Sequence, residues 1–440
     1  MLNNSILPLF KQCLLLVMLL VPVLQLQASE KSSSMLFNKD KSLIYSANFD
    51  AGSVSIIDKR SGKLLSENSI GRDIRRIALS ADNKLLLASD YLGDKLILLD
   101  ASDLSVINEV TTEARPFSIV FDKQHQQFYA VSFEKHKLLI INRDGEITDQ
   151  ITIAETPRGL ALTDDGRLLI THALTGELSI YDVTSAKPKL NKVLQLVDTE
   201  QNDTLSVPQG KPRLLDNIAI SPDGTQAWLP HLLWSFGHEF QFQSTVFPAI
   251  SIIDLTKGKE VELKQQRKLL FKQINIIESG NNQRIVANPH DAAFSEDGKK
   301  VIISTAGSED LIVFDLSRQG KSNKKRHRRK KFQGGVKATQ IYRNVPGDNP
   351  KALLISEQNL YVQKAMSLDI SQFDIGKPGP FSKVKVTNAD FAQLVKQDPV
   401  LPQMRLGKTL FNSANTAKGG QYPVAGDFWM SCNSCHIDGF

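Results

Sequence analysis

The chain has 440 residues, of which 41% are hydrophobic and 23% are charged, and this balance excludes a largely disordered protein. Its formal net charge is +6, but eight positive charges lie in one stretch, "KSNKKRHRRKKF" at 321–332. Subtracting these eight charges leaves −2, so the charge does not indicate a nucleic-acid partner. We expect the run Lys321 to Lys331 to be a solvated loop, with contact to membrane headgroups or an acidic partner as the alternative.

The N-terminus is typical of a secretory signal peptide. Lys11 precedes the apolar run "CLLLVMLLVPVL" at 13–24, and the small residue Ala28 follows at a plausible cleavage position. The run is shorter than the roughly 20 apolar residues that span a bilayer, so we expect no stable membrane span. An uncleaved anchor is the alternative. Residues 1–28 are therefore predicted to be a signal peptide and the protein to be periplasmic.

Seven related segments follow the leader. Each has an apolar strand, a turn often of the S-x-D-G kind, a second strand, a loop and a third strand. Their closing residues are Asp58, Asp100, Asn142, Asp182, Asp254, Asp315 and Asp374. The first four copies repeat every 40 to 42 residues, and the later copies carry insertions. Alternating apolar and polar residues predict half-buried strands, and a four-stranded repeat of about 40 residues indicates a β-propeller. We expect an all-β, seven-bladed β-propeller over residues 34–385.

Two of these segments, "YSANFDAGSVSIID" and "PDGTQAWLP", resemble the YVTN-type β-propeller family. The resemblance implies the fold and carries little about function, because propellers host many unrelated activities.

Basic and imidazole side chains recur before the first strand and after the second strand of several repeats. We expect these positions to share one rim of the propeller. The rim is either a docking or ligand face for an acidic partner or the C-terminal domain, or it reflects turn chemistry, and we favour turn chemistry. A metal site formed by His172, His231 and His290 at the central channel is less favoured, because no spacing rule links them. The rim positions are Arg75, Arg76, Pro157, Arg158, Pro212, Arg213, Pro289, His290, Pro350, Lys351, His172, His231, Trp234 and His238.

The composition changes after Asp374. "IGKPGPFSKVK" is a linker, and "NADFAQLVKQ", with Asn388 as its N-cap, predicts a short amphipathic helix. A second helix is expected where Met404, Leu406, Leu410 and Phe411 recur at helical spacing. Residues 386–440 are therefore predicted to be the start of a small, incomplete α-helical cytochrome c segment.

The chain ends in "DFWMSCNSCHIDGF", which contains the motif C-x-x-C-H. Two thiols on one turn can form thioether bonds to haem vinyl groups, and the next residue, His, then ligates the iron. A dithiol redox pair and half a zinc site are the alternatives; zinc needs four ligands, and no second Cys pair exists. We predict haem c covalently bound to Cys432 and Cys435, with His436 as the axial iron ligand. Met404 and Met430 are both candidates for the sixth ligand.

With "RLGKTLF" upstream, this ending resembles the start of the first haem domain of di-haem cytochrome c peroxidases, in particular the variant fused behind a YVTN-type propeller. The resemblance implies electron transfer with a redox partner such as a small cytochrome or cupredoxin. It implies peroxidase activity only with further haem-domain sequence, so we expect a truncated domain and an inactive chain. The alternative is a propeller that binds a ligand or protein beside a non-catalytic haem segment. No residue is assigned a catalytic role.

Overall fold

The computed structural model describes residues 30–196, 209–239, 245–261, 276–277, 283–284, 286–317, 338–377, 382–415, 430–436 and 438. The predicted signal peptide, residues 1–28, and the basic run Lys321 to Lys331 lie outside these residues. In the described ranges, no helix combines the length and the apolar character that a membrane span requires.

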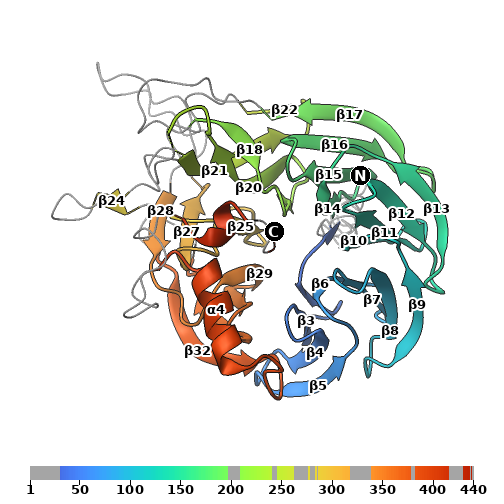
Figure 1. The fold of residues 1–440 in the computed structure, drawn as a ribbon, viewed down its shortest axis with the longest axis horizontal. Coiled ribbons are helices and arrows are strands. Elements are labelled where there is room, and N and C mark those ends of the chain that lie inside the picture. The colour runs from blue at the N-terminus through green and yellow to red at the C-terminus, as the bar shows by residue number, and fades with distance from the viewer. Residues whose placement is uncertain are drawn as a thin grey trace, which may run out of the picture.

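Seven antiparallel sheets are arranged in a ring around a central axis, which confirms the predicted seven-bladed propeller (Figure 1). Within each of the first four blades, consecutive strands pair in chain order. The strands of blades 1 and 2 are β2 (Met35–Phe37), β3 (Leu43–Asn48), β4 (Ser53–Asp58), β5 (Leu64–Ser69), β6 (Ile74–Leu79), β7 (Leu85–Asp90), β8 (Lys95–Asp100) and β9 (Val106–Thr111). Those of blades 3 and 4 are β10 (Pro116–Asp122), β11 (Gln127–Ser132), β12 (Lys137–Ile141), β13 (Ile147–Thr152), β14 (Pro157–Leu162), β15 (Arg167–His172), β16 (Glu177–Asp182) and β17 (Lys189–Gln195).

The last three blades are less regular, as the longer spacing of their repeats predicts. Blade 5 contains β18 (Lys211–Arg213), β19 (Ala219–Ile220), β20 (Gln226–Trp234), β21 (Val246–Asp254) and β22 (Lys259–Glu260). A separate ribbon is formed by β23 (Ile276–Ile277) and β24 (Gln283–Arg284). Blades 6 and 7 contain β25 (Pro289–Phe294), β26 (Lys300–Thr305), β27 (Asp310–Asp315), β28 (Ala338–Tyr342), β29 (Pro350–Ser356), β30 (Asn359–Lys364), β31 (Asp369–Asp374) and β32 (Lys385–Gln393).

The repeated aspartates that close the third strands hold the turns that follow them. The Oδ1 atom of Asp100 accepts a hydrogen bond from the backbone N–H of Ser102 at 2.8 Å. Asp182 accepts one from Thr184 in the equivalent turn of blade 4, also at 2.8 Å. A short carboxylate side chain can replace a backbone acceptor two residues before the donor, which is why Asp recurs at this position.

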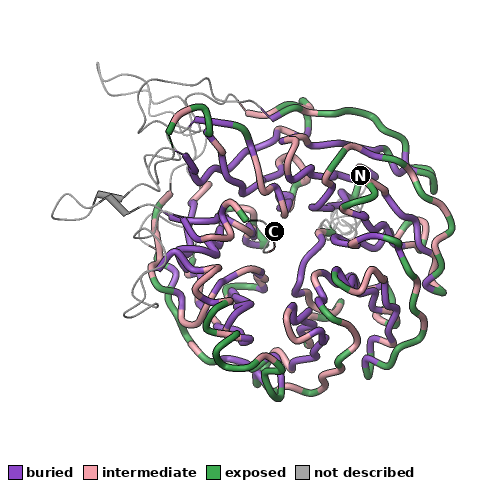
Figure 2. The backbone as a smooth tube through the Cα atoms, in the orientation of Figure 1, coloured by how far each residue is buried: buried purple, intermediate pink, exposed green. Residues whose placement is uncertain are grey.

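The core consists of apolar layers between neighbouring blades. Tyr129 of β11 and Ile170 of β15 belong to one cluster between blades 3 and 4. Trp228 of blade 5 meets Phe314 of blade 6 edge to face, with ring centroids 5.3 Å apart. The inner strands are buried, and the outer strands alternate between exposed and partly buried positions (Figure 2). Each blade therefore depends on its neighbours for burial of its faces.

The segment that precedes blade 1 crosses the ring and ties distant blades together. Its first strand, β1 (Glu30–Lys31), pairs with β14 of blade 4. Ser32 Oγ accepts a hydrogen bond from Ile119 N–H of blade 3 at 3.0 Å, and Lys31 Nζ forms an ion pair with Asp291 of blade 6 at 2.9 Å. This crossing was not predicted from the repeats, because no repeat contains the segment.

The C-terminal part corrects one prediction and confirms another. Residues expected to form a helix from Asn388 instead lie in β32, the outer strand of blade 7, where Ala392 pairs with Ile370. Although Phe391 and Leu394 have helical spacing, the segment forms a strand because β31 pairs with it as the fourth strand of the blade. The second predicted helix is confirmed as α4 (Pro402–Asn412). Beyond it, the described residues add only the 3-10 turn η2 (Cys432–Ser434), so a cytochrome c domain is not shown.

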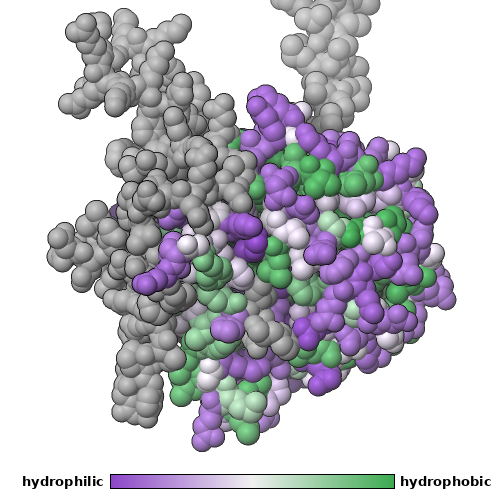
Figure 3. Space-filling model, turned by 45° about the horizontal axis from the view of Figure 1, so that its top comes forward, coloured by the Kyte–Doolittle hydropathy of each residue, from purple (hydrophilic) through white to green (hydrophobic). Residues whose placement is uncertain are grey.

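Hydrophilic side chains cover much of the face drawn in Figure 3, with apolar side chains between them. The described part of the ring therefore has a mixed surface on this side.

Candidate functional site

Several predicted rim residues lie at the same position in different blades, at the start of the innermost strand. Arg75, Arg158, His290 and Lys351 are each the second residue of β6, β14, β25 and β29. In all four strands the pairing register shifts in an interval that contains this position. A bulge re-aims side chains, and Pro is tolerated as a first strand residue because its missing N–H is not needed there. We call Arg75, Arg76, Arg158, His290 and Lys351 the axial cluster.

Blade 3 carries Phe117 at the equivalent position, after Pro116. Its ring lies under two guanidinium groups, 4.0 Å from that of Arg158 and 4.8 Å from that of Arg76. Tyr91 lies 4.6 Å from the guanidinium group of Arg75 and meets Phe117 edge to face. Such cation–π contacts favour the charged form and fix the planes of the guanidinium groups. The sequence analysis missed both rings, although Pro116-Phe117 follows the same pattern as Pro157-Arg158.

A carboxylate from the C-terminal end of the chain enters the axial cluster. Asp438 Oδ1 lies 2.7 Å from Arg75 Nη1, and its Oδ2 lies 2.9 Å from Arg158 Nη1. The side chain of Asp438 is only 9% exposed and that of Arg158 only 2%. Although burial alone would raise the pKa of Asp438, Arg158 and Arg75 lower it far below its usual range. The carboxylate is therefore ionised and tightly held.

Each of the two arginines also contacts a local carboxylate through another nitrogen. Arg75 Nη2 pairs with Asp73 at 2.7 Å, and Arg158 Nε lies 3.0 Å from Asp216. The Nη1 atoms are thus the groups that each arginine presents to Asp438.

Positive charge exceeds negative charge in this region. Arg76 is buried, donates to Asn217 Oδ1 at 3.2 Å and to the Arg75 carbonyl at 3.1 Å, and has no hydrogen-bond partner for its Nε. Burial lowers the pKa of Arg76 to about 10, and it lowers the pKa of Lys351 to about 8, with Arg75 adding to the shift of Lys351. Among the described residues, neither Arg76 nor Lys351 forms an ion pair. Unpaired buried cations are costly unless an anion compensates them.

The three histidines do not form a metal site. His172 Nε2 bonds to Ser179 Oγ and His231 Nε2 to Ser251 Oγ, each at 2.9 Å within its own blade. No group of three or more metal-ligating side chains occurs in the part of the chain that the structure describes. Burial lowers the pKa of both His172 and His290, and at His290 the charge of Lys351 adds to this effect, so that the pKa of His290 lies well below 6.5. The imidazole of His290 is therefore neutral in the axial cluster.

The C-x-x-C-H motif forms a single turn seated on blades 5 and 6. The N–H groups of Cys435 and His436 both donate to the Cys432 carbonyl, at 3.2 and 2.9 Å. Asn288 donates to Ser431 Oγ at 2.7 Å and accepts from Ser434 Oγ. The turn thus brings both cysteines together, as the motif predicts, and His436 is exposed.

An apolar cluster supports the turn. It contains Leu232, Val246 and Met430, and Cys435 packs against it. Burial raises the pKa of the Cys435 thiol. Of the two methionines considered as a sixth ligand, Met430 is buried in this cluster and Met404 is 58% exposed on α4. The haem assignment to Cys432, Cys435 and His436 stays a prediction.

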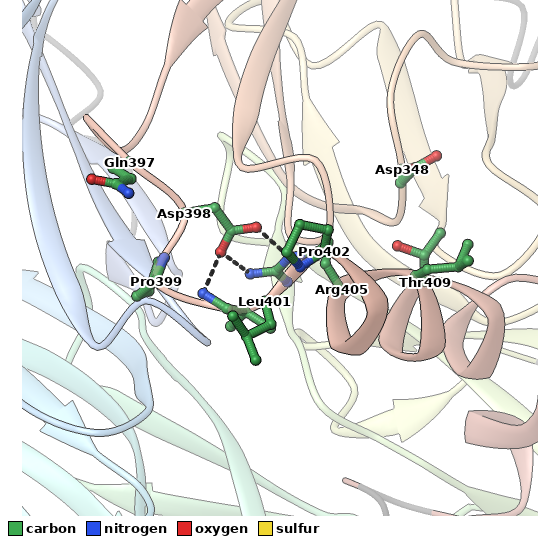
Figure 4. Close-up of a pocket in the computed structure, with 10 residues that line it drawn as sticks. Asp348, Gln397, Asp398, Pro399, Leu401, Pro402, Arg405 and Thr409 are labelled. Atoms are coloured by element: carbon green, nitrogen blue, oxygen red, sulfur yellow. Dashed lines mark hydrogen bonds and ion pairs between the residues drawn. The ribbon is translucent and has the colours of Figure 1, made fainter.

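Helix α4 is anchored to the ring by charge. Arg405 bonds to Asp398 at 2.8 Å and to Asp50 of blade 1 at 2.7 Å, and Lys408 adds a second contact to Asp50 at 2.8 Å. A groove of about 1160 Å³ lies along α4 and the loop before it, and Figure 4 shows Asp398 and Arg405 in its wall. None of the axial cluster lines this groove.

Comparison with known proteins relates the first blades to haem proteins. Residues 26–209, less than half of the chain, match the family described as the cytochrome D1 heme domain. A 74-residue stretch is 36% identical to the dihydro-heme d1 dehydrogenase of Pseudomonas aeruginosa, and covers 17% of this chain and 15% of that protein. The first part of the propeller is thus similar to cytochrome D1 heme domains. The match to the dehydrogenase covers only a small share of that protein's length.

Solved structures agree with the fold. Hydrazine synthase of Kuenenia stuttgartiensis is similar with a TM-score of 0.61 at 16% identity, over 77% of this chain and 94% of that one. Dihydro-heme d1 dehydrogenase NirN in complex with DHE has a TM-score of 0.50 at 15% identity, over 82% of this chain and 67% of that one. At such identities the likeness shows the fold alone. None of the matches described here supports the YVTN or peroxidase resemblance, which stay predictions.

Proposed function

We propose that the protein is an exported haem protein whose axial cluster binds an anionic tetrapyrrole of the d1 type and whose C-terminal motif carries covalent haem c. The observation that carries the proposal is the carboxylate of Asp438 between Arg75 and Arg158. Haem tetrapyrroles present carboxylates at their edge, and paired guanidinium groups suit that chemistry. The match of residues 26–209 to d1-haem domains supports the choice of tetrapyrrole.

The residues present fit such a group. The buried rings of Phe117 and Tyr91 lie against the guanidinium groups of Arg158 and Arg75 and hold them in place for such a ligand. Arg76 and Lys351 supply two further charges that no described carboxylate pairs. His290 would hold the iron, because a neutral imidazole has a free lone pair. A bound haem supplies a redox-active iron, and the chain's own groups bind its edge, orient it and compensate its charge.

The second haem rests on Cys432, Cys435 and His436. Asp438 lies two residues after His436, so the two Cα atoms are at most about 7 Å apart. The haem c site and the axial cluster are therefore neighbours, as a short electron path requires. We propose that the protein exchanges electrons in the periplasm with a small redox protein such as a cytochrome or cupredoxin. In the alternative, a binding module without electron transfer, the axial cluster acts alone.

Titration with iron mesoporphyrin tests the first haem. This porphyrin has two propionates and no vinyl groups, so it cannot form thioethers with the cysteines. We expect a shifted Soret band with the native chain and an affinity at least about tenfold weaker in the double variant Arg75→Gln, Arg158→Gln, since hydrogen bonds to charged groups contribute about 1.5–3 kcal/mol each. Arg143→Gln is the matched control, because Arg143 pairs with Asp82 on the outer surface. Equal affinity in all three proteins would contradict the proposal.

Haem staining tests the second haem. The full chain is produced with cytochrome c maturation and run on a denaturing gel stained for haem peroxidase activity. We expect a stained band that Cys435→Ala abolishes and that Cys13→Ala, in the predicted signal peptide, leaves unchanged. An unstained, soluble, full-length product would exclude covalent haem c and favour the binding module.

A further inference from the structure

Asp438 occupies the position at which the axial cluster would hold a ligand carboxylate. Both of its oxygens are used, one by each arginine, at 2.7 and 2.9 Å. The other ion pairs of Arg75 and Arg158 are with Asp73 and Asp216 on the ring itself. An incoming carboxylate that binds the same Nη1 atoms must therefore replace Asp438.

The charge balance makes this exchange favourable for an anion. With Asp438 in place, four cations (Arg75, Arg76, Arg158 and Lys351) face three carboxylates (Asp73, Asp216 and Asp438). Asp291, which also acts on Arg76, is already paired with Lys31. Without Asp438, four cations face two carboxylates. Two carboxylates cannot share the same pair of N–H donors without strong repulsion in a buried site, so the two occupants exclude each other.

The displaced residue belongs to the haem-attachment turn. Beyond Asp438, the turn is held to the ring by Asn288, through Ser431 and Ser434, and by the apolar cluster around Met430. Loss of the two ion pairs removes the contact that joins the turn to blades 2 and 4, and leaves its contacts with blades 5 and 6.

We propose that Asp438 is an internal ligand of the arginine pair: it competes with external carboxylate ligands, and its displacement releases the C-x-x-C-H turn from the axial cluster. The inference rests on the proposed function and adds its regulation. Because coupling between two sites is reciprocal, a change that holds the turn elsewhere must also raise the affinity of the cluster for its ligand.

Metal-free mesoporphyrin IX is the probe, since it carries two carboxylates and no iron that a thiol or imidazole could ligate. Binding to the full chain is followed by porphyrin fluorescence. We expect Asp438→Asn to bind the porphyrin about tenfold more tightly than the native chain. Asp438→Glu keeps the carboxylate and should bind the porphyrin with the affinity of the native chain. Asp82→Asn is the matched control, because Asp82 pairs with Arg143 at an exposed position.

The release of the turn has its own readout. In full chain produced without haem attachment, the alkylation rates of Cys432 and Cys435 report exposure of the turn. We expect the porphyrin to speed alkylation of the native chain severalfold, and Asp438→Asn to be alkylated rapidly without it.

The outcomes separate the two proposals. Tighter binding by Asp438→Asn with faster alkylation supports the internal ligand. Unchanged or weaker binding by Asp438→Asn, with loss of binding in the arginine double variant, overturns the internal ligand and leaves the proposed function standing. Failure of every protein to bind either porphyrin overturns both.

Discussion

Arg158 Nη1 and Asp438 Oδ2 lie 2.9 Å apart, although 280 residues separate them in the sequence. This ion pair joins the innermost strand of blade 4 to the second residue after the C-x-x-C-H motif. It makes Asp438 part of the axial cluster, together with Arg75.

Replacement of Arg158 should destabilise the whole ring. Its side chain is 2% exposed, lies over Phe117 and contacts Asp216 and Asp438. Arg158→Ala leaves two carboxylates without this partner, and the loss of one member of a buried pair costs about 3–5 kcal/mol. Urea unfolding followed by circular dichroism measures the change. The exposed control Arg143→Gln should stay within about 0.5 kcal/mol of the native protein, and an equal effect of both variants would argue against the buried pairing.

Porphyrin affinity should fall as the pH rises through about 8. Burial, together with the charges of Arg75 and Arg76, lowers the pKa of Lys351 from 10.5 to about 8, although Asp438 and Asp216 act in the opposite direction. Lys351 is therefore charged below pH 8 and loses its charge, and its attraction for an anion, above it. Fluorescence titrations between pH 7 and 9 measure the effect. Lys351→Arg keeps its charge over this range, so its affinity should not follow the same curve; a parallel decline would assign the pH dependence elsewhere.

His290 should affect the iron porphyrin and not the metal-free porphyrin. Its imidazole is neutral because burial and the neighbouring charge of Lys351 lower its pKa well below 6.5. The spectrum of bound iron mesoporphyrin should thus be constant from about pH 6 to 8, and His290→Ala should change it. The affinities of the native chain and of His290→Ala for metal-free mesoporphyrin should agree within about twofold. If His290→Ala weakens the binding of both porphyrins equally, His290 shapes the site and does not ligate iron.

The segment that crosses the ring should contribute to its stability. Lys31 pairs with Asp291, whose side chain is 4% exposed, at 2.9 Å. Among the described residues, Lys31→Ala leaves that carboxylate with its backbone donors, Ala292 and Leu353, and we expect a loss of about 1–3 kcal/mol in the free energy of unfolding. The matched control is Lys41→Ala, whose partner Glu296 is exposed. Thermal unfolding of both variants tests the difference, and equal midpoints would show that the crossing segment adds little.

Much of the ring is predictable from the sequence because each blade is a local unit. Asp100 and Asp182 end third strands and hold the next turn through backbone N–H groups two residues away, so their spacing reports the repeat directly. The helix predicted around Phe391 was wrong because the structure of this segment depends on pairing with a strand outside it. The neighbours of Phe391 in β32 pair with β31, and only the assembled blade 7 shows that this edge needs a strand.

The sequence by itself determined the seven blades, α4 and the turn that brings Cys432 and Cys435 together, since each depends on residues near one another in the chain. It also marked the basic positions that begin several inner strands, although it favoured turn chemistry for them. Only the tertiary structure decided that these positions meet as the axial cluster and that Asp438 enters it. Such contacts join residues hundreds of positions apart, and they exist only when the closed ring brings the inner strands to one axis.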